Sequence, residues 1–129
     1  MEPTRSDSFL VARSSFLQRG VELFNSECFW DAHEAWEQIW LAAQGDEKQF
    51  LQGLIQLAAA YHHVQRGTSP RGAMRLFDAA LRRLAPHPPL HDGIDREKAI
   101  VAAMRHREQI ASGESTDNFH YPKLSFLAR

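Results

Sequence analysis

The sequence contains one cysteine, Cys28, so no disulfide can form within the chain. A chain of 129 residues buries enough surface to fold without such a crosslink, and an unpaired cysteine is typical of proteins in reducing compartments. The N-terminal segment Met1–Asp7 lacks the apolar run that a secretory signal requires. These absences favour a cytoplasmic protein.

Two further absences limit the partners of the chain. Its longest apolar run, Leu54–Tyr61, is interrupted by Gln56 and is too short to cross a bilayer. Neither sign of charge dominates, because the formal net charge is −1 and the charged residues are interspersed. A protein that binds nucleic acid or an anionic membrane would carry a basic excess. We therefore expect neither nucleic acid nor a membrane as a partner.

Alternation of apolar and polar residues, which signals a half-buried strand, is nearly absent. Asp92-Gly93 is a hairpin-turn dipeptide, but it follows a proline-rich segment and precedes a helical pattern, so we expect a loop there. Elsewhere apolar residues recur at spacings of three and four, which predicts helices. The predicted helices are 14–24, 29–43, 47–65, a fourth that begins at Pro70 and stops at Pro86, and 94–111.

Short links between these helices favour antiparallel neighbours, so the chain is predicted to be one all-α domain, a bundle of about five helices. Residues 1–12 would form an N-terminal extension. Asn25 and Gly67 are expected as left-handed helix stops, and Ser69 as the cap of the fourth helix. The extended tail, 114–129, is too apolar to be free, which predicts that it lies on the bundle or on a second subunit.

The second predicted helix carries a large aromatic and polar face. Three tryptophans fall on one broad side of it, with a histidine and a glutamate between them. A buried carboxylate without a donor is costly, so we expect the central glutamate, Glu37, to meet a hydrogen-bond donor. The residues on this face or at its edge are Trp30, His33, Glu34, Trp36, Glu37 and Trp40.

The third predicted helix has a polar row, Gln52, Gln56 and His63, and is otherwise apolar on nearly all sides. We expect this helix at the centre of the bundle, with Gln56 and His63 facing the second helix at His33 and Glu37. The candidate binding residues are therefore His33, Glu34, Glu37, Trp40, Gln52, Gln56 and His63.

Several motifs occur together in the first two thirds of the chain. They are Phe24-Asn25, Ala32-His33-Glu34 with Glu37 and Trp40, the run Gly53–Ala60, and His63 and Gly67. This combination, within residues 20–84, resembles the domain-of-unknown-function family numbered 309. The resemblance implies a small all-helical protein, mostly bacterial or archaeal, of unestablished function. Its recurring polar positions would be His33, Glu34, Glu37, Gln56 and His63. Glu27 departs from the pattern, since many relatives have glycine at this turn.

The segment His33–Glu37 is similar to the His-Glu-x-x-His zinc motif, but Glu37 stands where the second histidine ligand would be. Zinc accepts imidazole and carboxylate, and a pair of carboxylates three residues apart can hold manganese or iron. The candidate ligands of a divalent metal are His33, Glu34, Glu37 and His63. No histidine follows a glutamate by three residues, which argues against the repeated Glu-x-x-His pattern of di-iron bundles.

Three interpretations of these polar residues stay open. They could form a structural hydrogen-bond network in a non-enzymatic, self-associating module. They could bind a metal in a small hydrolase. They could also line a site for a small molecule or peptide, with His33 or His63 as base and Glu37 orienting it. No nucleophile is evident, so no catalytic residue is assigned.

Arginines gather in and just before the fourth helix, opposed only by Asp78. They could bind an anionic partner, or they could form an ordinary solvated helix face. These arginines are Arg66, Arg71, Arg75, Arg82 and Arg83. The remaining histidines show no ligand spacing and are expected at the surface or in loops. They are His62, His87, His91, His106 and His120.

Overall fold

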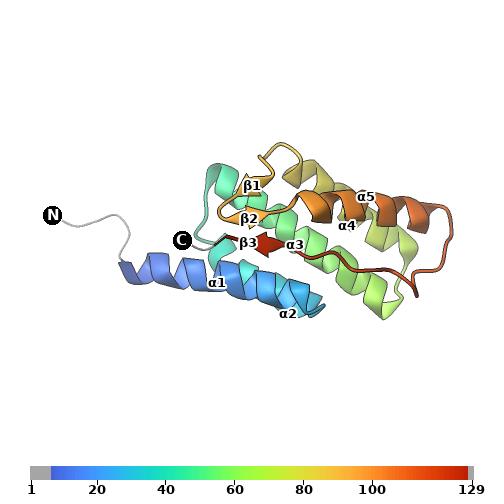
Figure 1. Cartoon of the computed structure of the whole chain (residues 1–129), viewed down its shortest axis with the longest axis horizontal. Coiled ribbons are helices and arrows are strands. Elements are labelled where there is room, and N and C mark those ends of the chain that lie inside the picture. The colour runs from blue at the N-terminus through green and yellow to red at the C-terminus, as the bar shows by residue number, and fades with distance from the viewer. Residues whose placement is uncertain (1–6, 128–129) are drawn as a thin grey trace.

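A computed structural model describes residues 7–127, with side chains from residue 11 onward. It confirms the predicted all-α bundle of five helices with a C-terminal tail, and adds a small three-stranded sheet (Figure 1). The elements are α1 (Asp7–Asn25), α2 (Phe29–Trp40), α3 (Gly45–Arg66), α4 (Pro70–Leu84), β1 (Leu90–His91), β2 (Ile94–Asp95), α5 (Glu97–Ala111) and β3 (Ser125–Phe126). None of the described helices has the length and apolarity needed to cross a bilayer.

The helices form two layers. Each helix packs against the next one in the chain, from α1 on α2 to α4 on α5. In Figure 1, α1, the tail and α5 lie in front, and α2, α3 and α4 lie behind them. The front of α3 carries Phe50, Leu54, Leu57 and Tyr61, which are all fully buried between the layers. This arrangement agrees with the central position expected for the third helix.

Several predicted helix boundaries are wrong. Helix α1 begins at Asp7, so residues 7–12 are not an extension, and residues 1–6 lie outside the described part of the chain. Helix α2 ends at Trp40, three residues early. The side chain of Ser69 makes no capping hydrogen bond. Gly67 does end α3 in the left-handed region, with φ 65°, as predicted.

The segment after α4 contains the hairpin that we did not expect. Asp92 and Gly93 have φ values of 53° and 79°, and they join β1 to β2 as a tight turn. β3 pairs with the other edge of β2, with Ile94 opposite Phe126. Strands of two residues are too short to show alternation, which is why the pattern missed them. Because Ile94 and Asp95 are paired in the sheet, α5 begins only at Glu97.

The α1–α2 turn holds the end of the tail. The left-handed residue is Glu27, with φ 64°, rather than Asn25 as predicted. Glycine adopts this conformation more readily than glutamate does, because it has no β-carbon. Asn25 instead uses its amide to bond the backbone of Leu124, donating to its carbonyl and accepting from its N–H, each at 2.8 Å.

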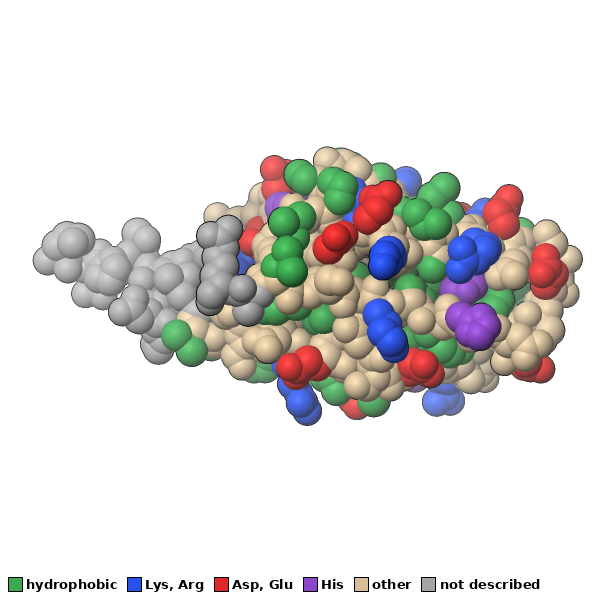
Figure 2. Space-filling model, in the orientation of Figure 1, with side chains coloured by type: hydrophobic (Ala, Val, Ile, Leu, Met, Phe, Trp, Pro, Cys, Tyr) green, Lys and Arg blue, Asp and Glu red, His purple; other side chains and the backbone are tan. Residues whose placement is uncertain are grey.

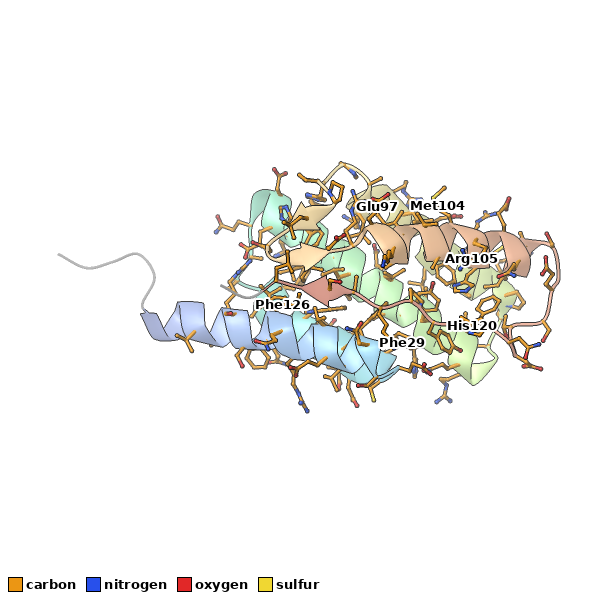
Figure 3. The ribbon with its side chains drawn as sticks, viewed as in Figure 1. Phe29, Glu97, Met104, Arg105, His120 and Phe126 are labelled. Atoms are coloured by element: carbon orange, nitrogen blue, oxygen red, sulfur yellow. The ribbon has the colours of Figure 1, made fainter. Side chains whose placement is uncertain are left out.

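The tail covers the front of α3 with its own side chains. Leu124 is buried, and Tyr121 lies edge-on against the rings of Phe29 and Tyr61, at 5.3 and 5.6 Å. Phe119 stacks on His106, with ring centroids 4.1 Å apart. Figure 3 shows the course of the tail, with His120 beside Arg105 of α5 at one end and Phe126 at the other. The described tail therefore lies on its own bundle.

A histidine expected at the surface lies in this core. His106 is 2% exposed, and its Nδ1 is 2.7 Å from the hydroxyl oxygen of Tyr61. Burial lowers the pKa of His106 to about 4, and the nearby charges of Arg105 and His120 contribute to this shift. Burial also raises the pKa of Tyr61. Both groups are therefore neutral at pH 7.

Because the pKa of His106 is lowered in the folded protein, we expect the protein to lose stability in acid. As the pH falls from 6.5 to 4, His106 takes up a proton in the unfolded chain but not in the folded one. The free energy of unfolding should therefore fall by up to about 3 kcal/mol over this range. Urea denaturation at a series of pH values measures the slope. A His106→Leu variant that also carries Tyr61→Phe should show a flatter dependence, and an unchanged slope would contradict this assignment.

The contact between α1 and α2 depends on Gly20. The indole of Trp36 is fully buried and lies directly over this glycine, and its N–H donates to the carbonyl of Leu17 at 3.2 Å. A β-carbon at position 20 would overlap the indole ring. The absence of a side chain at Gly20 therefore decides how closely these two helices approach.

Gly20→Ala should lower the free energy of unfolding by about 2–3 kcal/mol, because the buried ring has no room to move. Gly72→Ala is the matched control. There the nearest atoms belong to His63, at 3.9 Å, and alanine favours the helix, so stability should stay the same or rise by up to about 1 kcal/mol. Equal losses in the two variants, measured by urea denaturation, would argue against the steric explanation.

Candidate functional site

The outward sides of α2, α3 and α4 form one continuous surface, the α2–α3–α4 face. Because these helices make up the rear layer of Figure 1, this face is turned away from the viewer there. Figure 2 shows the opposite face, on which acidic, basic and apolar side chains are mixed and no single sign of charge gathers. The candidate residues from the sequence belong to the rear face.

Two contacts fix how α2 runs along α3. The ammonium of Lys48 lies 4.2 Å from the ring centroid of Trp40, and the rings of Trp30 and His62 are 5.2 Å apart. The two helices are therefore antiparallel, with the end of α2 beside the start of α3. Measured along the axis of α3, Glu37 is therefore at the same height as Gln52, and His33 is near the height of Gln56.

The α2 side of the face is more open than predicted. Trp30 is 45% exposed and stacks on His33, with ring centroids 4.5 Å apart. The side chain of Glu37 is 51% exposed, and its carboxylate lies 3.6 Å from Nε2 of His33. Glu34 is also exposed. The expectation that Glu37 is a buried carboxylate is therefore wrong, because water solvates much of this group.

The expected pairing of His63 with α2 is also wrong. Its Nδ1 lies 2.6 Å from the hydroxyl of Thr68, and its ring faces Gly72 at the start of α4. The histidine next to α2 is His62, whose pKa is lowered by burial and by the neighbouring Arg66, His63 and His33. Consecutive residues of a helix point about 100° apart, so one histidine flanks α2 and the next flanks α4.

Three polar atoms along the α2–α3 contact are buried without a hydrogen-bond partner in the described part of the chain. They are Nδ1 of His33, Nε1 of Trp40 and Oε1 of Gln56. Each such atom costs about 1–3 kcal/mol relative to a solvated or bonded one. Native proteins rarely keep several of these atoms in one place unless a further group or a function accounts for them.

The proposed metal ligands do not come together. His33 and Glu37 are neighbours, but His63 lies on the α4 side of α3. Among the residues that the structure describes, no three His, Cys, Asp or Glu side chains are grouped so that they could hold a metal ion. The described residues therefore do not supply the set of metal ligands that the hydrolase interpretation requires.

The α4 side of the face is basic. Arg71, Arg75 and Arg82 are exposed or partly exposed, as is Arg83, whereas the one acid of the helix, Asp78, pairs with Arg107 of α5 at 3.0 Å. Arg66 belongs to α3, one turn after His62, and so lies apart from the other four. Four of the five arginines predicted as a patch are therefore on one helix.

These features define a small five-helix bundle with one open three-helix face. Residues 17–76, which include α2 and α3, match the family model described as "Domain of unknown function (DUF309)". A conserved hypothetical protein from Thermus thermophilus, TTHA0068, has a similar crystal structure, with 32% sequence identity and a TM-score of 0.63. The similarity covers 70% of this chain and 94% of that one. The chain belongs to the DUF309 family, in agreement with the resemblance found in the sequence.

No curated protein matches the chain significantly. The family description and the name of the Thermus protein leave function open, so the comparisons establish family and fold.

The unpartnered amide of Gln56 makes a testable prediction. Gln56→Met keeps the size of the side chain and removes the buried polar atoms, so it should raise the free energy of unfolding by about 1 kcal/mol. Gln52→Met is the control and should change stability little, because no atom of Gln52 is buried and unpartnered. Urea denaturation of the monomer, at concentrations checked by sedimentation, measures both. A loss of stability in Gln56→Met would show that the amide has a partner.

Proposed function

We propose that this protein is a non-enzymatic helical module that self-associates, two copies meeting through their α2–α3–α4 faces. One observation carries the proposal, the opposite charge of the two outer helices of the face. Helix α2 contains Asp31, Glu34 and Glu37 and no lysine or arginine. Helix α4 contains four arginines, and its one acid is already paired with α5. Between them, the outward strip Gln52, Gln56 and Ala59 of α3 is uncharged.

A face with this order of charges is complementary to itself. In a two-fold dimer the same surface of both copies is used, and each contact occurs twice. An axis that lies in the plane of the interface and runs parallel to α3 sets the acidic α2 of each copy over the basic α4 of the other. A two-fold axis across the helices would instead set α2 over α2 and acid against acid, so electrostatic complementarity selects one arrangement.

The registers of the helices suggest which residues meet. Arg83 donates to Gln49, and His63 lies beside Gly72, so Arg75 is near the level of Ala59. Glu37 is level with Gln52, and Glu34, about one turn before it in α2, is near the level of Gln56. Rotation about an axis parallel to α3 keeps each residue at its level, so it brings the exposed Glu34 of one copy toward Arg75 of the other.

The size and composition of the face suit such an interface. Helix α3 has 22 residues and is about 33 Å long, and three packed helices are about 25 Å wide. That area is comparable to the roughly 800 Å² that each partner buries in a stable complex. The half-exposed Trp30 can stack with an arginine of the second copy, and tryptophan and arginine are the residues that most often dominate binding energy.

The proposal assigns no reaction to the chain, since His63 and His33 lie on different sides of α3. The hydroxyl next to His63, that of Thr68, also donates to the backbone carbonyl of His63 at 3.2 Å, as a group that closes the end of a helix does. It places the module in the cytoplasm, which the single exposed cysteine supports, because an unpaired thiol persists in a reducing compartment.

Charge reversal tests the interface. The unmodified protein should sediment as a dimer at micromolar concentration. Glu34→Arg alone and Arg75→Glu alone should each weaken association about tenfold or more, because each sets like charges together twice per dimer. The chain with both substitutions should regain dimerisation to within a few-fold, because the swap restores opposite charges. Sedimentation equilibrium in low salt measures all four proteins.

Glu22→Arg, on exposed α1 in the front layer, is the control and should leave association unchanged. The proposal fails if the unmodified protein is monomeric throughout the concentration series. It also fails if the double substitution is as weak as either single one.

A further inference from the structure

A cleft of about 620 Å³ opens where α4 ends and α3 begins. Sites of about 300–1,000 Å³ are typical for small molecules. Its walls come from the first turns of α3, the last turn of α4 and the proline-rich segment that follows. The lining residues are Asp46, Gln49, Arg82, Arg83, Pro86, His87, Pro88 and His91. Because prolines flank His87 on both sides, the backbone of this wall has little freedom.

The cleft has more cations than anions. Arg82 and Arg83 line it, and neither forms an ion pair with a carboxylate within residues 11–127. Arg83 donates only to the amide oxygen of Gln49 among the described residues. Asp46 is the one carboxylate in the lining.

A third arginine lies behind the histidines. Arg96 is 5% exposed, and its guanidinium donates to the backbone carbonyl of His87 and to the carboxylate of Glu97. Its Nε is buried and has no partner in the described part of the chain. A buried guanidinium keeps its charge at all relevant pH values, so it adds a fixed positive potential to this wall.

Two histidines complete the site. The rings of His87 and His91 are 4.9 Å apart, and both lie against the buried ring of Phe50, at 5.4 and 4.4 Å. Burial lowers the pKa of His87, as do the neighbouring His91 and Arg96, whereas Asp46 acts in the opposite direction. His91 has a carboxylate of Asp92 at 3.8 Å from its Nε2.

The partial charges at the two helix ends next to the cleft are compatible with a negatively charged ligand. The amino end of α3 carries partial positive charge, and the side chain of Gln44 makes no capping bond there. The carbonyls at the end of α4 carry partial negative charge, but the N–H groups of Ala85 and His87 already bond two of them, those of Leu81 and Leu84.

We propose that this cleft binds a small oxyanion, the phosphate or carboxylate group of a small molecule, through the guanidinium groups of Arg82 and Arg83. Guanidinium groups bind such anions with paired N–H donors in a geometry that lysine cannot offer. His87 and His91 lie at the inner wall, where each can donate a hydrogen bond to the anion once protonated. The site does not depend on self-association, because one copy supplies all of its lining residues and neither arginine belongs to the Glu34–Arg75 contact.

Binding should depend on pH in a defined direction. A bound anion favours the charged form of both histidines, so binding takes up protons, and affinity rises as the pH falls. The charged groups that face the two imidazoles are Asp46, Asp92, Arg82, Arg83 and Arg96. The arginines and the aspartates keep their charge between about pH 6 and pH 8, but inorganic phosphate itself gains negative charge in this range, so the contribution of the histidines is measured with sulfate, whose charge stays constant.

Titration with inorganic phosphate, followed by calorimetry at constant ionic strength, tests the site. The unmodified protein should bind phosphate saturably, and it should bind sulfate at least several-fold more tightly at pH 6 than at pH 8. The Arg82→Gln, Arg83→Gln double variant should bind at least tenfold more weakly. The matched control is Arg71→Gln, at the other end of the same helix and outside the cleft, and it should bind within about two-fold of the unmodified protein. Parallel titrations with acetate distinguish a carboxylate site from a phosphate site.

The proposal is overturned if neither anion binds saturably at either pH. It is also overturned if the double variant binds as tightly as the Arg71→Gln control. The Glu34→Arg variant separates this site from self-association, since it should bind phosphate as the unmodified protein does even when it is monomeric. Loss of anion binding in that variant would contradict the independence of the cleft.

Discussion

The structure depends on the burial of α3. This helix has apolar residues on nearly all sides, and α2 and α4 can cover only its two flanks. Its front, with Phe50, Leu57 and Tyr61, must be covered by something else. The C-terminal tail covers Tyr61, and His87 and His91, from the segment that leads into the small sheet, cover Phe50. The back of α3, which has glutamines instead of large apolar groups, stays open and becomes the middle strip of the α2–α3–α4 face.

Much of this architecture could be predicted from the sequence, because four of the five helices have long apolar periods and clear end signals. Pro70 and Gly67 mark boundaries that the structure reproduces. The hairpin at Asp92-Gly93 could not be recognised by pattern, since its strands contribute two residues each and its partner strand lies about thirty positions away. The start of α1 was missed because its first turns have no clear inner stripe.

The candidate site was only partly predictable. Its location on α2 and α3 followed from the clustering of polar residues among tryptophans, which periodicity can detect. Which of His62 and His63 faces α2 depends on a rotation of about 100°, and that is decided by how α3 packs against α4 as well as α2. The exposure of Glu37 and the burial of His106 depend on where the tail and the neighbouring helices lie. Residue spacing along one helix contains no such information.

The bond between Asn25 and Leu124 joins positions 99 residues apart, so it has a consequence for synthesis. A ribosome releases the chain from its N-terminus, and α1 to α4 emerge long before the segment that covers them. Until residues 121–124 leave the exit tunnel, the rings of Phe29 and Tyr61 lack the cover that Tyr121 provides and can attract other apolar surfaces. Completion of the fold must therefore wait until this segment has been synthesised.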